Sequence, residues 1–437
     1  MRNALQRILP GWAYDRLIGD WHPEGFKKYA ANTGWMFIGR VALYPLSIVV
    51  IAAVARYLGP NGLGTLSYAQ SIAGIVGTFA LLGIDQIIVR DLILQPDRRA
   101  EILGTALCIE TVSSVIAFLA TAIAFFFIDT NSQRFLILLF ASATMLTGPF
   151  SIGINLFTAD AQSKYPTIIS LATRSIIALL KLALVFLAAP LVWFASLLLL
   201  ESIITLCLSQ YFLHRVLGVS LRTLRFSLTM AKRLLHDSWP LLISATTVYL
   251  FARIDQVLLQ HFLGSGAVGY YSAAVQLTEA WTFIPTIVIG SLYPAVAGWY
   301  LRDHSVYMRR MRMMAVLCIG IACAVGAGII IFAPLIVHIV FGPAFRASVP
   351  VLRLYTLYVP VAVLYAILQN HLTTSNRTRL MVVIGSAGAL VNIGLNIALI
   401  PDYGAMGATA ATIVAGLVMI SIPFIDRTVR PATIRHA

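Results

Sequence analysis

Runs of about 20 apolar residues alternate with short polar segments along almost the whole chain. A helical run of this length rises 1.5 Å per residue and crosses a hydrocarbon layer about 30 Å thick. The pattern therefore predicts an all-α polytopic membrane protein with about twelve transmembrane helices. The predicted spans are residues 34–57, 65–89, 102–128, 135–158, 165–188, 191–213, 238–262, 268–299, 313–340, 349–372, 380–400 and 404–425.

The composition supports this reading. Of the 437 residues, 59% are hydrophobic and 11% are charged, whereas soluble domains are about 25% charged. Residues 1–33 are too polar for a secretory signal, so they are predicted to be a cytoplasmic segment, either an interfacial helix or a loose tail. The four cysteines fall inside predicted spans, where they behave as small apolar side chains, so we expect neither disulfides nor a metal site.

Basic residues are distributed unequally between the two sides. With the N-terminus placed inside, most of the 31 Lys and Arg residues fall in inner segments, and the outer segments hold only Arg56, Arg134 and Arg346. The positive-inside rule then places both termini in the cytoplasm. The net charge of +14 therefore reflects membrane topology, and we expect no nucleic-acid partner.

The loops restrict the function. The outer loops are very short, and a polysaccharide polymerase or glycosyltransferase needs a sizeable loop to hold donor and acceptor. No Gly-Lys pair occurs in the chain, so it has no Gly-rich phosphate-binding loop, which argues against an ATP-driven pump. These features favour a transporter over an enzyme, with no cofactor. The membrane-embedded enzyme remains a less favoured alternative.

Two stretches repeat in the same order. Leu58–Ala69 (LGPNGLGTLSYA) realigns with Leu263–Ala274 (LGSGAVGYYSAA) at an offset of 205 residues, and residues 155–185 realign with 370–400. A duplication of six spans keeps both halves in one orientation, and such parallel repeats place the substrate site between the halves. The predicted divisions are an N-terminal segment (1–33), a first half (34–213), a basic cytoplasmic linker (214–237), a second half (238–425) and a cytoplasmic tail (426–437).

Three motifs carry a resemblance to a known family. They are VARYLGPNGLGTLSYAQS with LGIDQIIVRDL (54–92), RIDQVLLQHFLGSGAVGYYSAA (253–274), and FGPAFRASVPVLRL with NIALIPDYGAMGATAAT (341–412). With these motifs and its twelve spans, the chain resembles the oligosaccharide-flippase, or polysaccharide-export, branch of the multidrug, oligosaccharidyl-lipid and polysaccharide exporter superfamily. The match covers residues from about 34 to 423. Because the motifs are mostly turns and packing glycines, they indicate architecture better than cargo.

The resemblance implies a flippase of the bacterial inner membrane. Its substrate would be an undecaprenyl-pyrophosphate-linked oligosaccharide, moved from the cytoplasmic to the periplasmic leaflet as two six-helix halves rock, for O-antigen, capsule or exopolysaccharide assembly. Implied partners are membrane lipids and the polysaccharide polymerase and glycosyltransferases of the same pathway. The main alternative is an ion-coupled multidrug or small-molecule antiporter of the same superfamily, which would need an acidic or aromatic cavity.

Charged residues inside the spans are the candidate site residues, because a charge at mid-bilayer is costly unless it faces a cavity or a partner. A pyrophosphate crossing the membrane needs fixed cations. Arg353 has no acid near it in its hairpin, so we expect it to line the cavity between the halves. The basic candidates for substrate binding are Arg40, Arg174, Lys181, Arg253 and Arg353, and the acids are Asp85, Glu110, Glu201, Asp255 and Glu279.

Internal charge pairing is the competing interpretation. Three pairs of opposite charge lie at similar depths in the membrane when residues are counted from their hairpin turns. They are Lys181 with Glu201, Arg253 with Glu279, and Arg40 with Asp85. Asp255 is the less favoured partner of Arg253. The acids would otherwise couple transport to H⁺ or Na⁺, and the sequence leaves these roles open.

Overall fold

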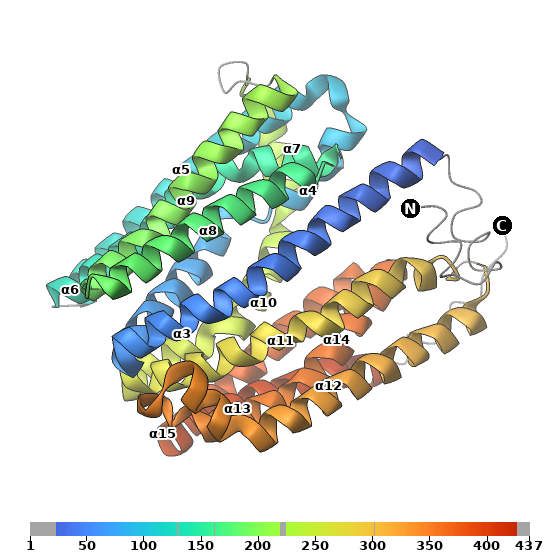
Figure 1. Ribbon diagram of the computed structural model, residues 1–437. Helices are drawn as coiled ribbons and strands as arrows, with labels where there is room; N and C mark the ends of the chain where they lie inside the picture. Colours follow the sequence, from blue (N-terminus) through green and yellow to red (C-terminus); the bar gives the residue numbers. More distant parts are fainter. Residues whose placement is uncertain (1–22, 129–130, 161, 219–223, 301, 426–437) are drawn as a thin grey trace.

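The computed structural model describes residues 23–128, 131–160, 162–218, 224–300 and 302–425; side chains are described from Leu46 onward, apart from ten further positions. Within these ranges every element is a helix (Figure 1). The elements are α3 (Pro23–Leu81), α4 (Asp85–Leu94), η1 (Pro96–Arg98), α5 (Arg99–Ile128), α6 (Ser132–Ala143), η2 (Thr144–Ser151), α7 (Ile152–Ala159), α8 (Lys164–Phe186), α9 (Leu191–Leu217), α10 (Leu228–Leu263), α11 (Ser265–Ala297), α12 (His304–Phe341), η4 (Pro343–Phe345), α13 (Ser348–Thr356), α14 (Tyr358–Thr374) and α15 (Thr378–Ile425).

The predicted number of about twelve spans is confirmed. Ten helical segments of the described chain are long and apolar enough to cross a membrane. Two of them, Leu46–Leu94 and Arg379–Pro423, contain 49 and 45 residues. At 1.5 Å per residue each would extend about 70 Å, more than twice the hydrocarbon thickness. Each turns sharply, at Gly59 or Gly404, and so supplies two spans.

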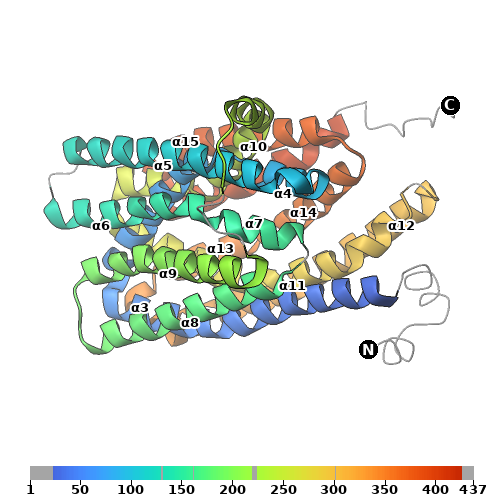
Figure 2. The same cartoon turned by 90° about the horizontal axis from the view of Figure 1, so that it is seen from above.

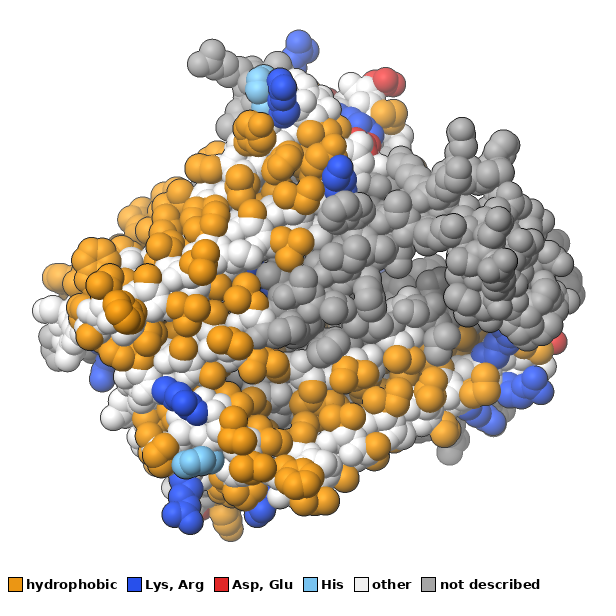
Figure 3. Space-filling view, in the orientation of Figure 1, with side chains coloured by type: hydrophobic (Ala, Val, Ile, Leu, Met, Phe, Trp, Pro, Cys, Tyr) orange, Lys and Arg blue, Asp and Glu red, His pale blue; other side chains and the backbone are white. Residues whose placement is uncertain are grey.

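The surface fits a multi-pass membrane protein. In Figure 3, hydrophobic side chains cover the visible side of the described helices, and Lys and Arg side chains gather toward its extremities. Helices of the two halves form two groups, with α5, α8 and α9 in one and α11, α12 and α14 in the other (Figure 1). Most run along a common direction, whereas the first turns of α10, before Pro240, cross it (Figure 2).

The repeated sequence motif forms the same turn twice. Gly59 has φ 66° and ψ −179°, and Gly264 has φ 80° and ψ −178°. This region of backbone space is open essentially to glycine alone. The repeated Leu-Gly pairs therefore mark two helix-to-helix turns at one end of the bundle. We call this the turn end; it comprises residues 57–64, 187–190, 263–267, 342–347 and 401–404.

The two halves are in closest contact at the turn end. A Cβ added to Gly64 would lie 1.8 Å from the Ser265 carbonyl oxygen, and one added to Gly269 would lie 1.9 Å from the Pro60 carbonyl oxygen. These two contacts are related by the repeat, because Gly269 and Ser265 follow Gly64 and Pro60 by 205 residues. The repeated segments thus meet face to face about the axis that relates the halves.

Further polar and apolar contacts join the two halves around Gly64 and Gly269. Arg56 of α3 donates from Nε to the Val340 carbonyl at 3.0 Å and from its terminal nitrogen to the Ile339 carbonyl, in the last turn of α12. The Thr65 hydroxyl donates to that of Ser265 at 3.1 Å. Ala55 and Leu63 of the first half are buried in a cluster whose other fully buried members belong to the second half. The turn end is therefore one shared core.

The opposite end carries most of the described basic residues, and we call it the basic end (90–99, 160, 162–164, 214–218, 224–233, 302–312 and 374–379). Here one buried cluster joins α4, α5, α7 and α9 to the first turns of α10, and a separate one joins α11, α12 and α14. Buried Asp91 of α4 binds Arg233 of α10. Of the segment expected as a linker, 214–237, the described residues 214–218 and 224–237 are thus partly helical, and those of α10 pack on the first half.

Candidate functional site: a cavity between the halves

A cavity of about 790 Å³ lies between the two halves. The first half contributes α3, α6, η2 and α9 to its wall, and the second half contributes α10 and α11. Along α3 the lining extends from Ser67 to Leu81, about 21 Å at 1.5 Å per residue. The cavity therefore begins next to the contact between Gly64 and Ser265 at the turn end, and it extends from there toward the basic end.

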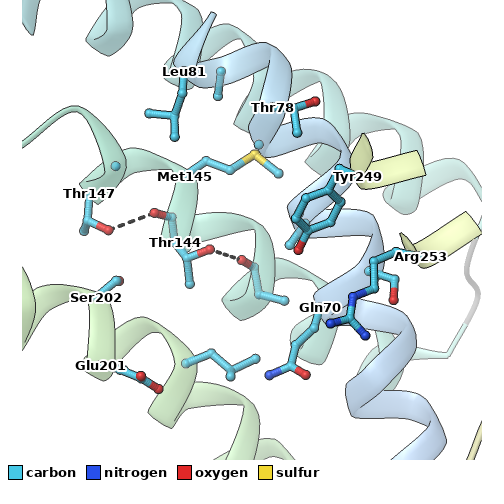
Figure 4. Close-up of a pocket in the computed structure, with 18 of the residues that line it drawn as sticks. Gln70, Thr78, Leu81, Thr144, Met145, Thr147, Glu201, Ser202, Tyr249 and Arg253 are labelled. Atoms are coloured by element: carbon cyan, nitrogen blue, oxygen red, sulfur yellow. Dashed lines mark hydrogen bonds between the residues drawn. The ribbon is translucent and has the colours of Figure 1, made fainter. Parts of the chain in front are cut away.

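The wall is rich in hydroxyl and amide groups. Such groups donate and accept hydrogen bonds without the desolvation cost of a charge. Figure 4 shows Gln70, Tyr249 and Arg253 on one side of the cavity and Glu201 and Ser202 on the opposite side. The uncharged polar lining residues are Ser67, Gln70, Ser71, Thr78, Thr144, Thr147, Ser151, Ser202, Thr205, Ser209, Tyr249, Gln256, Ser272 and Gln276.

Three charged side chains of the described part of the chain line this cavity. The Arg253 guanidinium lies 3.5 Å from a carboxylate oxygen of Glu279, and the two side chains are 30% and 50% exposed. Of the two partners expected for Arg253, the structure places Glu279 against it. With both groups this open to the cavity, Arg253 keeps donors available for an anion. Glu201 lies across the cavity on α9.

Tyr249 lies on α10 one turn before Arg253, and its ring projects against α3. A Cβ added to Gly74 would lie 2.0 Å from the Tyr249 hydroxyl oxygen. The absence of a side chain at Gly74 therefore makes room for the ring within the cavity. An aromatic face beside a guanidinium is a suitable surface for a sugar ring that carries a nearby phosphate.

A smaller cavity of about 170 Å³ adjoins the first half. Its lining includes Arg174 and Lys181 of α8, two turns apart, together with Glu201 of α9 and with Leu46, Ser47, Val50 and Ile51 of α3. Because Glu201 also lines the central cavity, it stands between that cavity and the two cations. Lys181 interacts electrostatically with Glu201 and with Arg174. This places the expected Lys181 and Glu201 pair in one site.

A third cavity, of about 260 Å³, lies inside the second half. Tyr355, Tyr358, Thr278 and Thr282 line it, and Glu279 is shared with the central cavity. Each half therefore has a side cavity that borders the central one at a glutamate. The first-half side cavity is cationic, and that of the second half is aromatic and hydroxylated.

Arg353 does not line the central cavity, contrary to the expectation from sequence. It is exposed, and its Nε donates to the Ile330 carbonyl of α12 at 3.1 Å. Pro334 lies four residues after Ile330 and has no N–H, so it leaves that carbonyl without its helical donor. Arg353 supplies the missing hydrogen bond, which gives this charge a structural role.

The other acids among the sequence candidates lie apart from the central cavity. Asp255 is buried and accepts hydrogen bonds from the Tyr271 hydroxyl and from the backbone N–H of Gln256. Asp85 accepts one from Asn155 Nδ2 at 2.6 Å, and Glu110 is buried in α5. The side chain of Arg40 lies outside the described residues, so its expected pairing with Asp85 stays a prediction.

Sequence reasoning missed the glutamines. Gln70, Gln256 and Gln276 all line the cavity. Each falls within a predicted span, where an amide is unusual unless it meets a partner or a cavity. A search for uncharged polar residues in spans, beside the charged ones, would have found them. Among the described residues, no group of three or more His, Cys, Asp and Glu side chains is arranged to hold a metal ion.

Comparison with known proteins identifies the family. The model of a family described as "Polysaccharide biosynthesis protein" matches residues 29–298, more than half of the chain. The chain belongs to this family. The assignment confirms the family that the sequence motifs indicate.

A curated relative and two solved structures are also similar. The chain is 27% identical over 176 residues to the "Probable flippase AglR" of Haloferax volcanii, an alignment that covers 38% of this chain and 35% of that relative. The chain thus spans about a third of the length of the relative it matches. A structure of the lipid II flippase MurJ in an inward closed conformation has a TM-score of 0.71 at 13% identity, covering 91% of this chain and 87% of that one.

An inward-facing multidrug resistance MATE transporter has a TM-score of 0.68, also at 13% identity, covering 89% of this chain and 97% of that one. At such identities the likeness to both structures shows a shared fold. The fold therefore does not distinguish a flippase from a drug transporter.

Proposed function

We propose that this protein is a flippase for a polyprenyl-pyrophosphate-linked oligosaccharide, which it moves between membrane leaflets for the assembly of a surface polysaccharide. Family membership, the resemblance to proteins named as flippases, and the chemistry of the cavity support this proposal. We further propose that the basic end faces the cytoplasm of a bacterial inner membrane, because basic segments stay on that side.

The central cavity is the observation that carries the proposal. It lies where two repeated halves meet, it is closed toward the turn end by backbone contacts, and it extends toward the basic end. Its volume of about 790 Å³ is within the usual range of about 300–1,000 Å³ for ligand sites. A short glycan fits such a space, and the polyprenyl tail would remain among the lipids.

The chemical character of the walls matches such a cargo. Sugar hydroxyls need donors and acceptors in equal measure, and the Ser, Thr and Gln lining offers both. A pyrophosphate needs cations, which Arg253 supplies at the cavity wall and Arg174 and Lys181 supply in the adjoining side cavity. The lining is mixed, whereas a cavity for cationic drugs would be acidic or aromatic.

The test is a leaflet-resolved assay in proteoliposomes. The purified protein is reconstituted with undecaprenyl-pyrophosphate-linked oligosaccharide, and the sugar exposed on each side is measured over time, with and without a pH or sodium gradient. We expect sugar to cross in wild-type vesicles and not in protein-free vesicles. Transport of a fluorescent cationic drug with no movement of the lipid-linked sugar would replace the proposal with the antiporter.

A further inference from the structure

The side cavity of the second half has an aromatic wall. Phe251 of α10, Tyr355 of α13 and Tyr358 of α14 line it. The Tyr358 ring follows that of Phe251 with centroids 6.2 Å apart, and the Tyr355 ring follows that of Tyr358 at 5.7 Å. Gly416 of α15 makes room for this wall, because a Cβ there would lie 2.9 Å from Cε2 of Tyr358. The rings form one continuous surface, on which the C–H face of a sugar ring can pack.

Hydroxyl groups with unused hydrogen-bonding capacity border these rings. No hydrogen bond joins the hydroxyl of Tyr355 or Tyr358 to another described residue, although Tyr355 is only 8% exposed. A buried tyrosine hydroxyl normally has a partner. Thr278 of α11 donates to the Ala274 carbonyl at 3.0 Å and keeps lone pairs for a further donor. The cavity therefore offers both donors and acceptors, as sugar hydroxyls require.

A further part of the wall is aliphatic. Such side chains neither donate nor accept hydrogen bonds, so a sugar hydroxyl placed against them would lose its hydration without replacement. A methyl group is favoured in the same place, because it is removed from water. The occupant that suits this wall therefore carries a methyl-ended substituent. The aliphatic residues are Pro285 and Ile289 of α11, with Val359, Ala362, Val363 and Ala366 of α14.

Glu279 connects the side cavity with the central one, since it lines both. Within the described chain it is the one charged side chain of the side cavity. The Arg253 guanidinium lies 3.5 Å from its carboxylate, so this negative charge is already compensated. A neutral occupant is therefore favoured over a cation. A ring in the side cavity and a phosphate at Arg253 would both adjoin Glu279, as two linked parts of one molecule would.

We propose that the side cavity of the second half binds the sugar next to the pyrophosphate of the cargo, and that this sugar carries an acetamido or a 6-deoxy group. The inference rests on the proposed function and adds a selective subsite to it. The volume of about 260 Å³ is below the range of about 300–1,000 Å³ for whole ligand sites, which suits one ring rather than a repeat unit. The ring packs on Tyr358, and its methyl group lies against the aliphatic wall.

Equilibrium binding of radiolabelled lipids to the purified full chain tests the subsite without a transport assay. The probes are undecaprenyl pyrophosphate without a sugar and the same lipid carrying glucose, 6-deoxyglucose or N-acetylglucosamine. We expect wild type to bind one of the two methyl-bearing lipids roughly tenfold more tightly than the glucose lipid, because a methyl group in an apolar pocket contributes about that much selectivity. The lipid that is preferred assigns the substituent.

Two variants locate the subsite. Tyr358→Ala should weaken binding of the sugar-bearing lipids roughly two- to tenfold and leave binding of the sugar-free lipid unchanged. Tyr365→Ala on the same helix is the matched control, because Tyr365 does not line the cavity, and it should bind every lipid as wild type does. If Tyr358→Ala does not fold, Ala362→Val gives an independent readout. Its larger side chain fills the aliphatic wall and should abolish the preference for the methyl-bearing lipid.

The outcomes separate this subsite from the proposed function. Equal binding of the glucose lipid and both methyl-bearing lipids by wild type would overturn the subsite and leave the flippase in place. An unchanged preference in folded Tyr358→Ala and Ala362→Val would do the same. Wild-type protein that binds none of these lipids would contradict the proposed function as well. Binding of tetraphenylphosphonium that Tyr358→Ala abolishes would assign the cavity to a cationic drug and overturn the proposal.

Discussion

The two ends of the bundle join the halves in different ways. At the turn end, Gly64 and Gly269 bring the backbone of each half against the other, and residues of both halves share one buried cluster. Toward the basic end, the buried cluster of the first half takes in only the first turns of α10, a second cluster holds α11, α12 and α14, and a polar cavity lies between the halves. Close-packed backbone cannot deform gradually, so the turn end must separate as a unit if the cavity is to open there.

The comparison also explains the distribution of sequence motifs. The repeated Leu-Gly segments lie at the turn end, where two copies of one shape pack about an axis. The cavity walls differ between the halves, with cations beside one and tyrosines beside the other. Symmetry is therefore retained where the halves close on each other and lost where a cargo with two unlike ends would bind.

The largest effect is expected at the paired glycines. Gly64→Ala and Gly269→Ala each place a Cβ within 2 Å of a carbonyl oxygen of the other half. Overpacking costs about 1–3 kcal/mol or more, which disfavours the closed turn end roughly 5- to 150-fold. Because the contacts are equivalent, both variants should lose transport to a similar degree. The measurement is lipid-linked sugar translocation in proteoliposomes.

Gly320→Ala is the matched control, since a Cβ there meets nothing within 4 Å. It should transport as wild type does. Wild-type transport and thermal stability in both Gly64→Ala and Gly269→Ala would show that the halves do not close through these residues.

The next effect is expected in the cavity, at Arg253. Arg253→Gln removes a guanidinium whose hydrogen bonds to an anion contribute about 1.5–3 kcal/mol, so transport should fall roughly tenfold or more. If Arg253 served only to neutralise Glu279, then the double variant Arg253→Gln with Glu279→Gln should restore function. Replacing both members of a buried ion pair destabilises a protein less than removing one member and leaving the other charge unpaired. We expect the double variant to reach the membrane and still fail.

Translocation is normalised to protein level in the membrane, with Glu279→Gln as the single-variant control. Recovery of the double variant to near wild type would remove Arg253 from the substrate site and leave it a structural charge.

A smaller effect is expected at Arg56, which joins α3 to the last turn of α12. Arg56→Gln should loosen the turn end by less than the glycine variants do, because Arg56 is exposed and water competes for the same carbonyls. The measurement is labelling of Ser265→Cys by a membrane-impermeant thiol reagent, in a chain whose native cysteines are replaced. Labelling should rise several-fold.

Arg346→Gln serves as the control, because it removes an exposed arginine of the same end without a contact between halves. Equal labelling in both variants would exclude Arg56 as a contact that holds the end closed.

The smallest effect is expected at Arg353. Its partner is the Ile330 carbonyl that Pro334 leaves unpaired, so Arg353→Gln should lower the melting temperature with little change in transport. Pro334→Ala restores an N–H to α12 and should recover the melting temperature of the double variant. Loss of transport in Arg353→Gln at normal stability would return this residue to the substrate site.

Much of the fold could be predicted from the sequence, because apolar run lengths and turn glycines are local signals. The twelve spans and the Leu-Gly turns follow from such patterns. The site could be predicted only in part. Depth counted from the turns places Arg253 near Glu279, but depth does not specify which face of a helix meets the cavity. Arg353 shows the limit, since its partner is a backbone carbonyl that no side-chain pattern reveals.

The most direct test locks the turn end. The hydroxyl oxygens of Thr65 and Ser265 are 3.1 Å apart across the halves, so Thr65→Cys with Ser265→Cys, in a chain without other cysteines, should form a disulfide on oxidation. If the cavity delivers its cargo through the turn end, oxidised vesicles should move no lipid-linked sugar, and reduction should restore the rate. Undiminished translocation by a fully cross-linked protein would contradict this account.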